Sequence, residues 1–246
     1  YANSNQYFIR YIAQRFGYFN TLQSIAGASE ASGFPINYLM TMKKGKQLCG
    51  KILTPIMAAG LIMNLFINKN TPLWVIIIAI FLYNFGFSGP GFTATNIQPD
   101  VTDVDEMITG RRREGVISTF NTLIKKTING LMSAFTGFIL NGFGLRTGAE
   151  NANALEQTAK GIFGLRLTYC ILPLIFVALV YVCVFTYKMT REDHKMIIEA
   201  IKEKKETGRC TLTPEQIKRC EEIAGQSFGD MWIGRPSADT LFAELD

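Results

Sequence analysis

This sequence lacks paired cysteines and clustered histidines. Its five cysteines form no C-x-x-C pair, and His194 is the single histidine. A zinc site draws its ligands from such residues, so we expect no metal site and regard the cysteines as isolated thiols. A nucleophile motif, a metal cluster and a phosphate-binding loop are missing too. These absences argue against an enzyme, and we expect neither a cofactor nor a nucleic acid partner.

The sequence starts at Tyr1, so it has no initiator methionine, and it has no cleavable signal pattern either. We therefore expect a fragment of a longer protein. Of its 246 residues, 48% are hydrophobic, and 25 basic side chains stand against 20 acidic ones. The apolar residues gather into runs of about 20, the length of a helix that crosses a bilayer. The sequence predicts an all-α membrane protein.

Five full membrane spans are predicted, at about residues 17–42, 48–67, 72–97, 116–143 and 162–187. Residues 1–16 have the character of the end of an earlier helix and a connection. The second half of the third span contains Gly86, Gly89, Pro90 and Gly91, which weaken a helix and leave room for a neighbour or a ligand. A broken helix near the middle of the membrane is a common way to build a transporter site.

Two spans carry charge far from their ends. Glu30 lies near the middle of the first span, where it either lines a cavity as a candidate substrate-binding residue or shows that this segment lies outside the membrane. Lys125 and Lys126 lie about 15 Å along the fourth span, too deep to reach the nearer surface easily. At least one of the two lysines should face a cavity or a carboxylate.

A charged segment, Asp100–Gly115, joins the third and fourth spans and reads D-V-T-D-V-D-E-M-I-T-G-R-R-R-E-G. We expect a short polar loop. Its acids follow one helix and its arginines precede the next, so each set has the wrong sign for the dipole of its own helix. These charges therefore need partners, either across the loop or elsewhere in the protein. Such a cluster of charges could make and break ion pairs as helices move, which is how a gate on the cytoplasmic side would work. The candidate residues of this gate are Asp100, Asp103, Glu106, Arg111, Arg112 and Arg113.

This segment resembles the loop between the tenth and eleventh helices of the glycoside-pentoside-hexuronide:cation symporters, the melibiose permease family of the major facilitator superfamily. Val104 departs from the family, which usually has tyrosine there. The resemblance covers about residues 1–205 and implies the C-terminal half of such a transporter, with five full spans and the end of a sixth. The matching positions are Asp100, Asp103, Glu106, Thr109, Gly110, Arg112, Arg113, Glu114 and Gly115.

The resemblance also implies a substrate site. Asn121, Thr122 and Lys126 fall where the family has polar residues and a lysine that line its sugar and cation cavity. Thr122 and Lys126 are four residues apart and so share a helix face. Lys125 has no counterpart in the family. Phe92 is the nearest aromatic residue to a tryptophan position of melibiose permease, so the surface that stacks on sugar, and with it the substrate, is expected to differ.

By this resemblance the full protein is a symporter in which Na⁺ or H⁺ drives uptake of a glycoside, pentoside or hexuronide. Two six-helix halves rock about a central site, and the cation carboxylates belong to the N-terminal half, which this chain lacks. Its partners would be membrane lipid, the sugar and that other half. Two alternatives stay open: a transporter of the same fold for a lysolipid or organic anion, and a non-transporting membrane scaffold or sensor.

Basic residues predict the orientation. The short loops on one face of the membrane hold eight basic residues, and those on the other face hold three to five. Basic loops favour the cytoplasmic side. The charged loop and the tail, residues 188–246, are therefore expected inside the cell, at the plasma membrane. Thr190 and Thr213 are predicted caps of two amphipathic tail helices. The basic residues on the inner face are Lys43, Lys44, Lys46, Arg111, Arg112, Arg113, Lys188 and Arg191.

Overall fold

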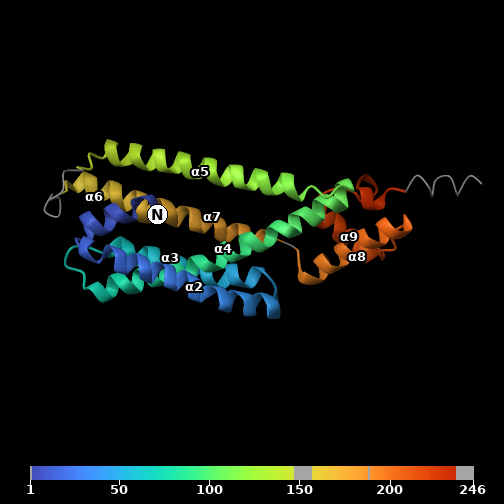
Figure 1. Ribbon diagram of the computed structural model, residues 1–246, viewed down its shortest axis with the longest axis horizontal. Coiled ribbons are helices and arrows are strands. Elements are labelled where there is room, and N and C mark those ends of the chain that lie inside the picture. The colour runs from blue at the N-terminus through green and yellow to red at the C-terminus, as the bar shows by residue number, and fades with distance from the viewer. Residues whose placement is uncertain (1, 147–156, 188, 237–246) are drawn as a thin grey trace, which may run out of the picture. The chain divides into compact units, whose positions relative to one another are not determined.

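The computed structural model describes residues 2–146, 157–187 and 189–236 (Figure 1). Within these residues the regular structure is helical, with no strand, so the predicted all-α fold is confirmed. The chain divides into two compact units, one of Tyr1–Thr93 with Ile124–Thr186 and one of Ala94–Leu123 with Tyr187–Asp246. Much of the segment between the fourth and fifth predicted spans, and the end of the tail, lie outside the described residues.

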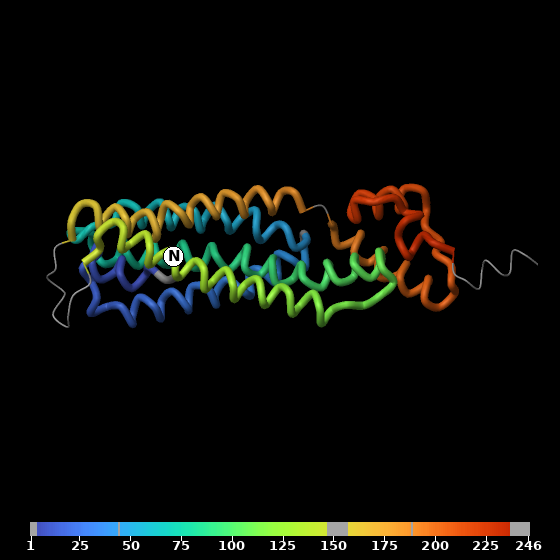
Figure 2. Tube along the Cα trace, turned by 90° about the horizontal axis from the view of Figure 1, so that it is seen from above, coloured from blue at the N-terminus to red at the C-terminus, as the bar shows by residue number. Residues whose placement is uncertain are grey.

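The first unit holds the most apolar helices. α3 and α7 lie side by side in it (Figure 2). It also takes in the first part of α4 and the later part of α5, and π-helical turns at Phe8–Ile12 and Leu167–Ile171 follow α1 and join α6 to α7. The helices are α1 (Ala2–Tyr7), α2 (Phe19–Lys44), α3 (Gln47–Phe66), α4 (Leu73–Thr109), α5 (Glu114–Gly142), α6 (Ala159–Arg166) and α7 (Leu172–Thr186).

Three helices of the described chain are long and apolar enough to cross a membrane. They are α3, α4 and the continuous helical stretch Ala159–Thr186. α2 and α5 are also long, but α2 is rich in small polar residues and α5 carries Lys125 and Lys126. Helices of this composition cross a bilayer only with one face shielded by protein or water. Their crossing therefore stays a prediction.

The predicted break in the third span is wrong, because α4 continues as a helix through Pro90. The glycines before it leave room for a neighbour, as predicted, and that neighbour is α3. A Cβ atom built on Gly86 would lie 2.2 Å from the backbone nitrogen of Met57, and one on Gly89 would lie 2.5 Å from the Cβ atom of Leu53. Small residues allow helix backbones to approach this closely in lipid. The packing against α3 supports the helix where proline removes a hydrogen bond.

We predict that Gly86→Ala destabilises the protein by about 1–3 kcal/mol, the usual cost of overpacking a tight contact. Gly130→Ala on α5 is the control, since a Cβ atom there meets nothing within 4 Å. It should be neutral or stabilise by up to about 1 kcal/mol, because alanine favours helix more than glycine does. Thermal unfolding of the purified variants in detergent measures both changes. Equal midpoints for the two variants would contradict the close contact.

A buried aromatic stack ties the start of the chain to the last span. The rings of Phe8 and Tyr169 stack with their centroids 4.0 Å apart. The Tyr169 hydroxyl donates to Oδ1 of Asn5 at 2.9 Å, and Nδ2 of Asn5 donates to Oε1 of Gln23 at 2.8 Å. This chain of hydrogen bonds satisfies polar groups that would be costly to bury alone. It fixes α1 against α2 and against the turn before α7.

The second unit is built by the tail around the end of α4. It contains α8 (Arg191–Thr207), α9 (Pro214–Ala224) and 3₁₀ turns at Phe228–Asp230 and Trp232–Gly234. Thr190 and Thr213 cap the two helices, as expected from the sequence, and each forms a capping box. Its buried core is formed by Met107, Met189, Ile197, Ala200, Ile201, Cys220, Met231 and Ile233.

The prediction of a loop over Asp100–Gly115 is wrong, because most of this segment is helix. α4 runs to Thr109, and α5 begins at Glu114. The helix continues because its carboxylates are buried against partners rather than exposed to water, as the next section describes. Gly110 then ends it in the left-handed conformation, at φ +70°.

Candidate functional site

Three carboxylates share one face at the end of α4. Asp100, Asp103 and Glu106 recur at intervals of three residues, so they lie along one side of the helix. Their exposed fractions are 2%, 7% and 2%. Ionised groups this deeply buried are stable only when they are paired and hydrogen-bonded. Each of the three has such partners within the second unit.

The first partners come from the tail. The hydroxyl of Tyr187 donates to Oδ2 of Asp100 at 2.6 Å. Nε2 of His194 lies 2.8 Å from Oδ2 of Asp103 and 3.4 Å from Oδ1 of Asp100. The single histidine of the chain therefore bridges two buried aspartates.

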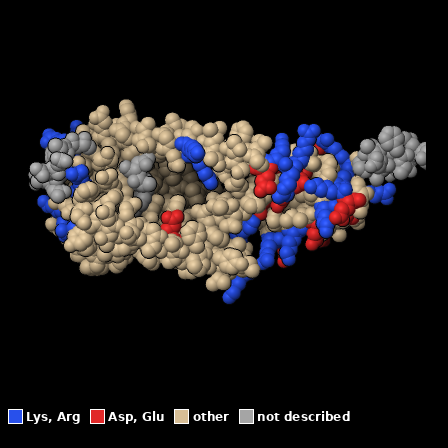
Figure 3. Space-filling model, viewed as in Figure 1, with Lys and Arg blue, Asp and Glu red and all other residues tan. Residues whose placement is uncertain are grey.

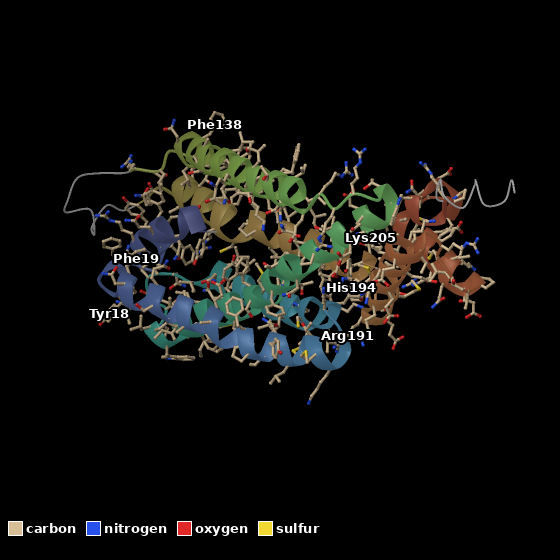
Figure 4. All side chains as sticks on the ribbon, turned by 45° about the vertical axis from the view of Figure 1, so that its right-hand side comes forward. Tyr18, Phe19, Phe138, Arg191, His194 and Lys205 are labelled. Carbon is tan, nitrogen blue, oxygen red and sulfur yellow. The ribbon has the colours of Figure 1, made fainter. Side chains whose placement is uncertain are left out.

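Cations from the loop and from α8 meet on the third carboxylate. Nη1 of Arg112 lies 3.1 Å from Oε2 of Glu106 and 3.2 Å from Oδ1 of Asp103. The ammonium of Lys205 pairs with Oε1 of Glu106. His194 and Lys205 stand near opposite ends of α8 (Figure 4). The sequence left open whether the acids pair across the loop or elsewhere, and the structure shows both.

The other two arginines differ from Arg112. Arg113 pairs with Asp105, and its Nε donates to Oδ2 of that residue at 3.0 Å. Both atoms are near the surface, where such pairs contribute little to stability. In the described part of the chain, the side chain of Arg111 makes no hydrogen bond or ion pair. Of the three arginines, Arg112 alone reaches the buried carboxylates.

Packing also joins the tail to the end of α4. A Cβ atom on Gly110 would lie 2.5 Å from Cδ1 of Trp232, so only glycine fits against this indole. Val104 packs against the core of the second unit. The apolar residue at the position where the family has tyrosine thus contributes to this core.

Sequence reasoning missed the tail side chains of this cluster. A signal was present, since His194, Ile197, Ile201 and Lys205 recur at helical spacing on one face of α8. The sequence showed an apolar stripe there, but not that it packs on the acids of α4. Figure 3 shows charged side chains gathered over the second unit, while the visible surface of the first is largely uncharged.

The predicted substrate residues are not joined into one cluster by contacts within either unit. Lys126 and Thr122 are exposed on α5. Nδ2 of Asn121 donates to Oε1 of Gln98 on α4 at 2.8 Å, within the second unit. Phe92 lies with its ring centroid 6.3 Å from that of Phe34. These positions do not test a role in binding.

Glu30 lies half-buried on α2. Among the described residues, no ion pair or hydrogen bond joins it to Lys126. Its assignment to the substrate site also stays a prediction.

A second ion pair stabilises the tail. Oδ1 and Oδ2 of Asp193 accept hydrogen bonds from Nε and Nη2 of Arg219 at 3.0 and 2.9 Å. The backbone amide of Thr190 also donates to Oδ2 at 2.7 Å. Burial raises the pKa of Asp193, but the hydrogen bonds from Arg219 and Thr190 outweigh it, so the net pKa is lowered.

The lowered pKa predicts a pH dependence. The ionised carboxylate of Asp193 stabilises the folded state at pH values above the unfolded pKa of about 4. This contribution is lost as pH falls through the lower pKa that Asp193 has in the folded state. Asp193→Asn should therefore remove about 1–3 kcal/mol at pH 7. Hydrogen exchange of the α8 amides at pH 7 measures this loss. Glu192→Gln, in the same turn and exposed, is the control and should leave the exchange unchanged. Equal protection in both variants would contradict the assignment.

Comparison with protein families identifies the class. Residues 2–191 match the family described as MFS/sugar transport protein. Since the match covers most of the chain, the chain belongs to this family, and it is a membrane protein of the major facilitator superfamily. Members of the family are transporters rather than enzymes. The comparison found no curated protein and no solved structure that matches the chain.

Proposed function

We propose that the chain is the C-terminal half of a cation-coupled sugar symporter of the glycoside-pentoside-hexuronide family. Family membership over residues 2–191 supports a transporter related to sugar transport. The finer assignment rests on the residues of the charged segment that resemble this family. Na⁺ or H⁺ coupling would depend on carboxylates of the N-terminal half.

The observation that carries the proposal is the exposed ammonium of Lys126 on a long helix. Its neighbours Leu123 and Ile128 are 58% and 52% exposed, as suits a helix that faces lipid or another domain. A charged side chain in that setting is costly unless it faces a cavity or a partner. Lys126 has no ion pair within the described residues. In this proposal its ammonium donates to sugar hydroxyls or to carboxylates of the other half.

In this proposal the carboxylate cluster of α4 is the inner gate. Asp100, Asp103 and Glu106 would hold the charged loop and the tail together in one state of the transport cycle. The tail would lie in the cytoplasm and the transporter in the plasma membrane, as the basic loops predict. Rocking of the two halves would change the surroundings of the cluster and let its ion pairs exchange partners.

Transport by the complete protein tests the proposal. We predict gradient-dependent accumulation of one radiolabelled glycoside, pentoside or hexuronide in vesicles, driven by Na⁺ or by H⁺. Lys126→Ala should lower kcat/KM about tenfold to a hundredfold, because a hydrogen bond from a charged donor contributes about 1.5–3 kcal/mol.

Lys125→Ala is the matched control, since the two neighbouring lysines point about 100° apart on the helix. It should change uptake by about twofold at most. Equal loss in both variants would remove the special role of Lys126. Absence of accumulation of every sugar by folded protein would favour another solute, such as a lysolipid or organic anion, and next a scaffold.

A further inference from the structure

An open cavity of about 300 Å³ lies beside the end of α5 that is farthest from the charged loop. All of its lining residues belong to the first unit. They are Tyr7 from α1, Ser133, Thr136, Gly137, Leu140 and Asn141 from α5, and Leu145 just beyond it. Among these described lining residues, no side chain is charged.

The polar groups of this cavity are free to bind a ligand. Helical serines and threonines commonly donate to a carbonyl one turn back, as Ser29 does at 2.6 Å. In the described chain, the hydroxyls of Ser133 and Thr136 make no such bond. The side chains of Tyr7 and Asn141 likewise make no hydrogen bond to the described protein. Two hydroxyls, a phenol and an amide therefore line one small space with no hydrogen-bond partner among the described residues.

The cavity continues the helix face that carries Lys126. Seven residues turn a helix by about 700°, so Ser133 lies within about 20° of Lys126 and about 10 Å further along the axis. Gly137 falls on the same face, eleven residues from Lys126. A solute that leaves this cavity along α5 would therefore come next to the lysine of the proposed central site.

The lining selects a class of ligand. Neutral donors and acceptors beside an aromatic ring suit the hydroxyls and the C–H face of a sugar, and a neutral lining gives an organic anion no counter-charge. The volume is at the small end of ligand pockets, which fits one sugar ring better than a lipid chain. The ring of Tyr7 is held by stacking on Tyr11, with 6.4 Å between centroids.

We propose that this cavity is a second sugar subsite, which holds a single neutral sugar ring before it reaches, or after it leaves, the site at Lys126. The inference rests on the proposed function, because it assumes that the solute is a sugar. In the orientation proposed above, this end of α5 is the outer one. The subsite would therefore bind sugar from outside the cell and raise its concentration near the central site.

Filling the cavity tests the subsite in the complete transporter. A Cβ atom on Gly137 meets nothing within 4 Å, so Gly137→Leu extends into the open space without a clash at its base. We expect KM for the transported sugar to rise about tenfold, equivalent to about 1.4 kcal/mol of binding, with kcat unchanged. Gly142→Leu is the control, because Gly142 has equal space and does not line the cavity. It should leave KM unchanged.

A second measurement does not need transport. In a Ser133→Cys variant, maleimide labelling is followed peptide by peptide by mass spectrometry, with methyl β-D-glucoside or D-xylose as the probe and sorbitol as the osmotic control. A bound sugar should abolish labelling at position 133 at saturation. A Phe138→Cys variant is the control, since Phe138 is 76% exposed and points away from the neighbouring helices (Figure 4). Its labelling should not change.

The outcomes separate the two proposals. An unchanged KM in Gly137→Leu, with no protection of position 133 by any probe, overturns the subsite, and loss of uptake in Lys126→Ala would then leave the proposed function standing. Protection of position 133 in a protein that accumulates no sugar supports the subsite as a binding site and overturns symport. Protection at both labelled positions shows a general change in access and overturns the subsite.

Discussion

The burial of three carboxylates at the end of α4 is the constraint on which the second unit depends. Asp100, Asp103 and Glu106 carry negative charge at the end of a helix whose dipole is also negative there. Pairing with cations and a hydroxyl offsets this repulsion and the loss of water. The loop supplies one cation and the tail supplies the rest, so the acids connect segments about a hundred residues apart in the sequence. A change in any partner would alter this whole unit.

The first unit depends on a different interaction, the close approach of helix backbones. Gly60, Gly86 and Gly89 let α3 and α4 meet with no space for side chains between them. In lipid the hydrophobic effect does little to bring helices together, so packing of this kind supplies much of the attraction. α5, in contrast, leaves long apolar side chains such as Phe138 exposed. This is expected of a helix that meets lipid or a further domain.

Much of this architecture could be predicted from the sequence, because apolar runs and capping residues are local signals. The all-α fold follows from the runs, and Thr190 and Thr213 mark the tail helices through their neighbours. The end of α4 could not be predicted in this way. The acids after residue 97 have the composition of a loop, and only their burial against His194 and Lys205, contacts between distant segments, keeps them helical. The break predicted near Pro90 was wrong for a similar reason, because packing against α3 supports the helix around this proline.

For the charged segment, the need for ion-pair partners could be predicted from the sequence, but the helical conformation could not. Electrostatics alone required partners for its acids, and the structure supplies them.

The most direct test of the central claim is a double-mutant cycle on Glu106 and Lys205. Thermal unfolding is measured for the wild type, Glu106→Gln, Lys205→Met and the double variant. If the pair of buried Glu106 with half-exposed Lys205 holds the tail on α4, the two changes should be coupled by about 1–3 kcal/mol, since each single variant leaves one charge unpaired. Additivity within about 0.5 kcal/mol would show that the two side chains do not interact, and would contradict this account.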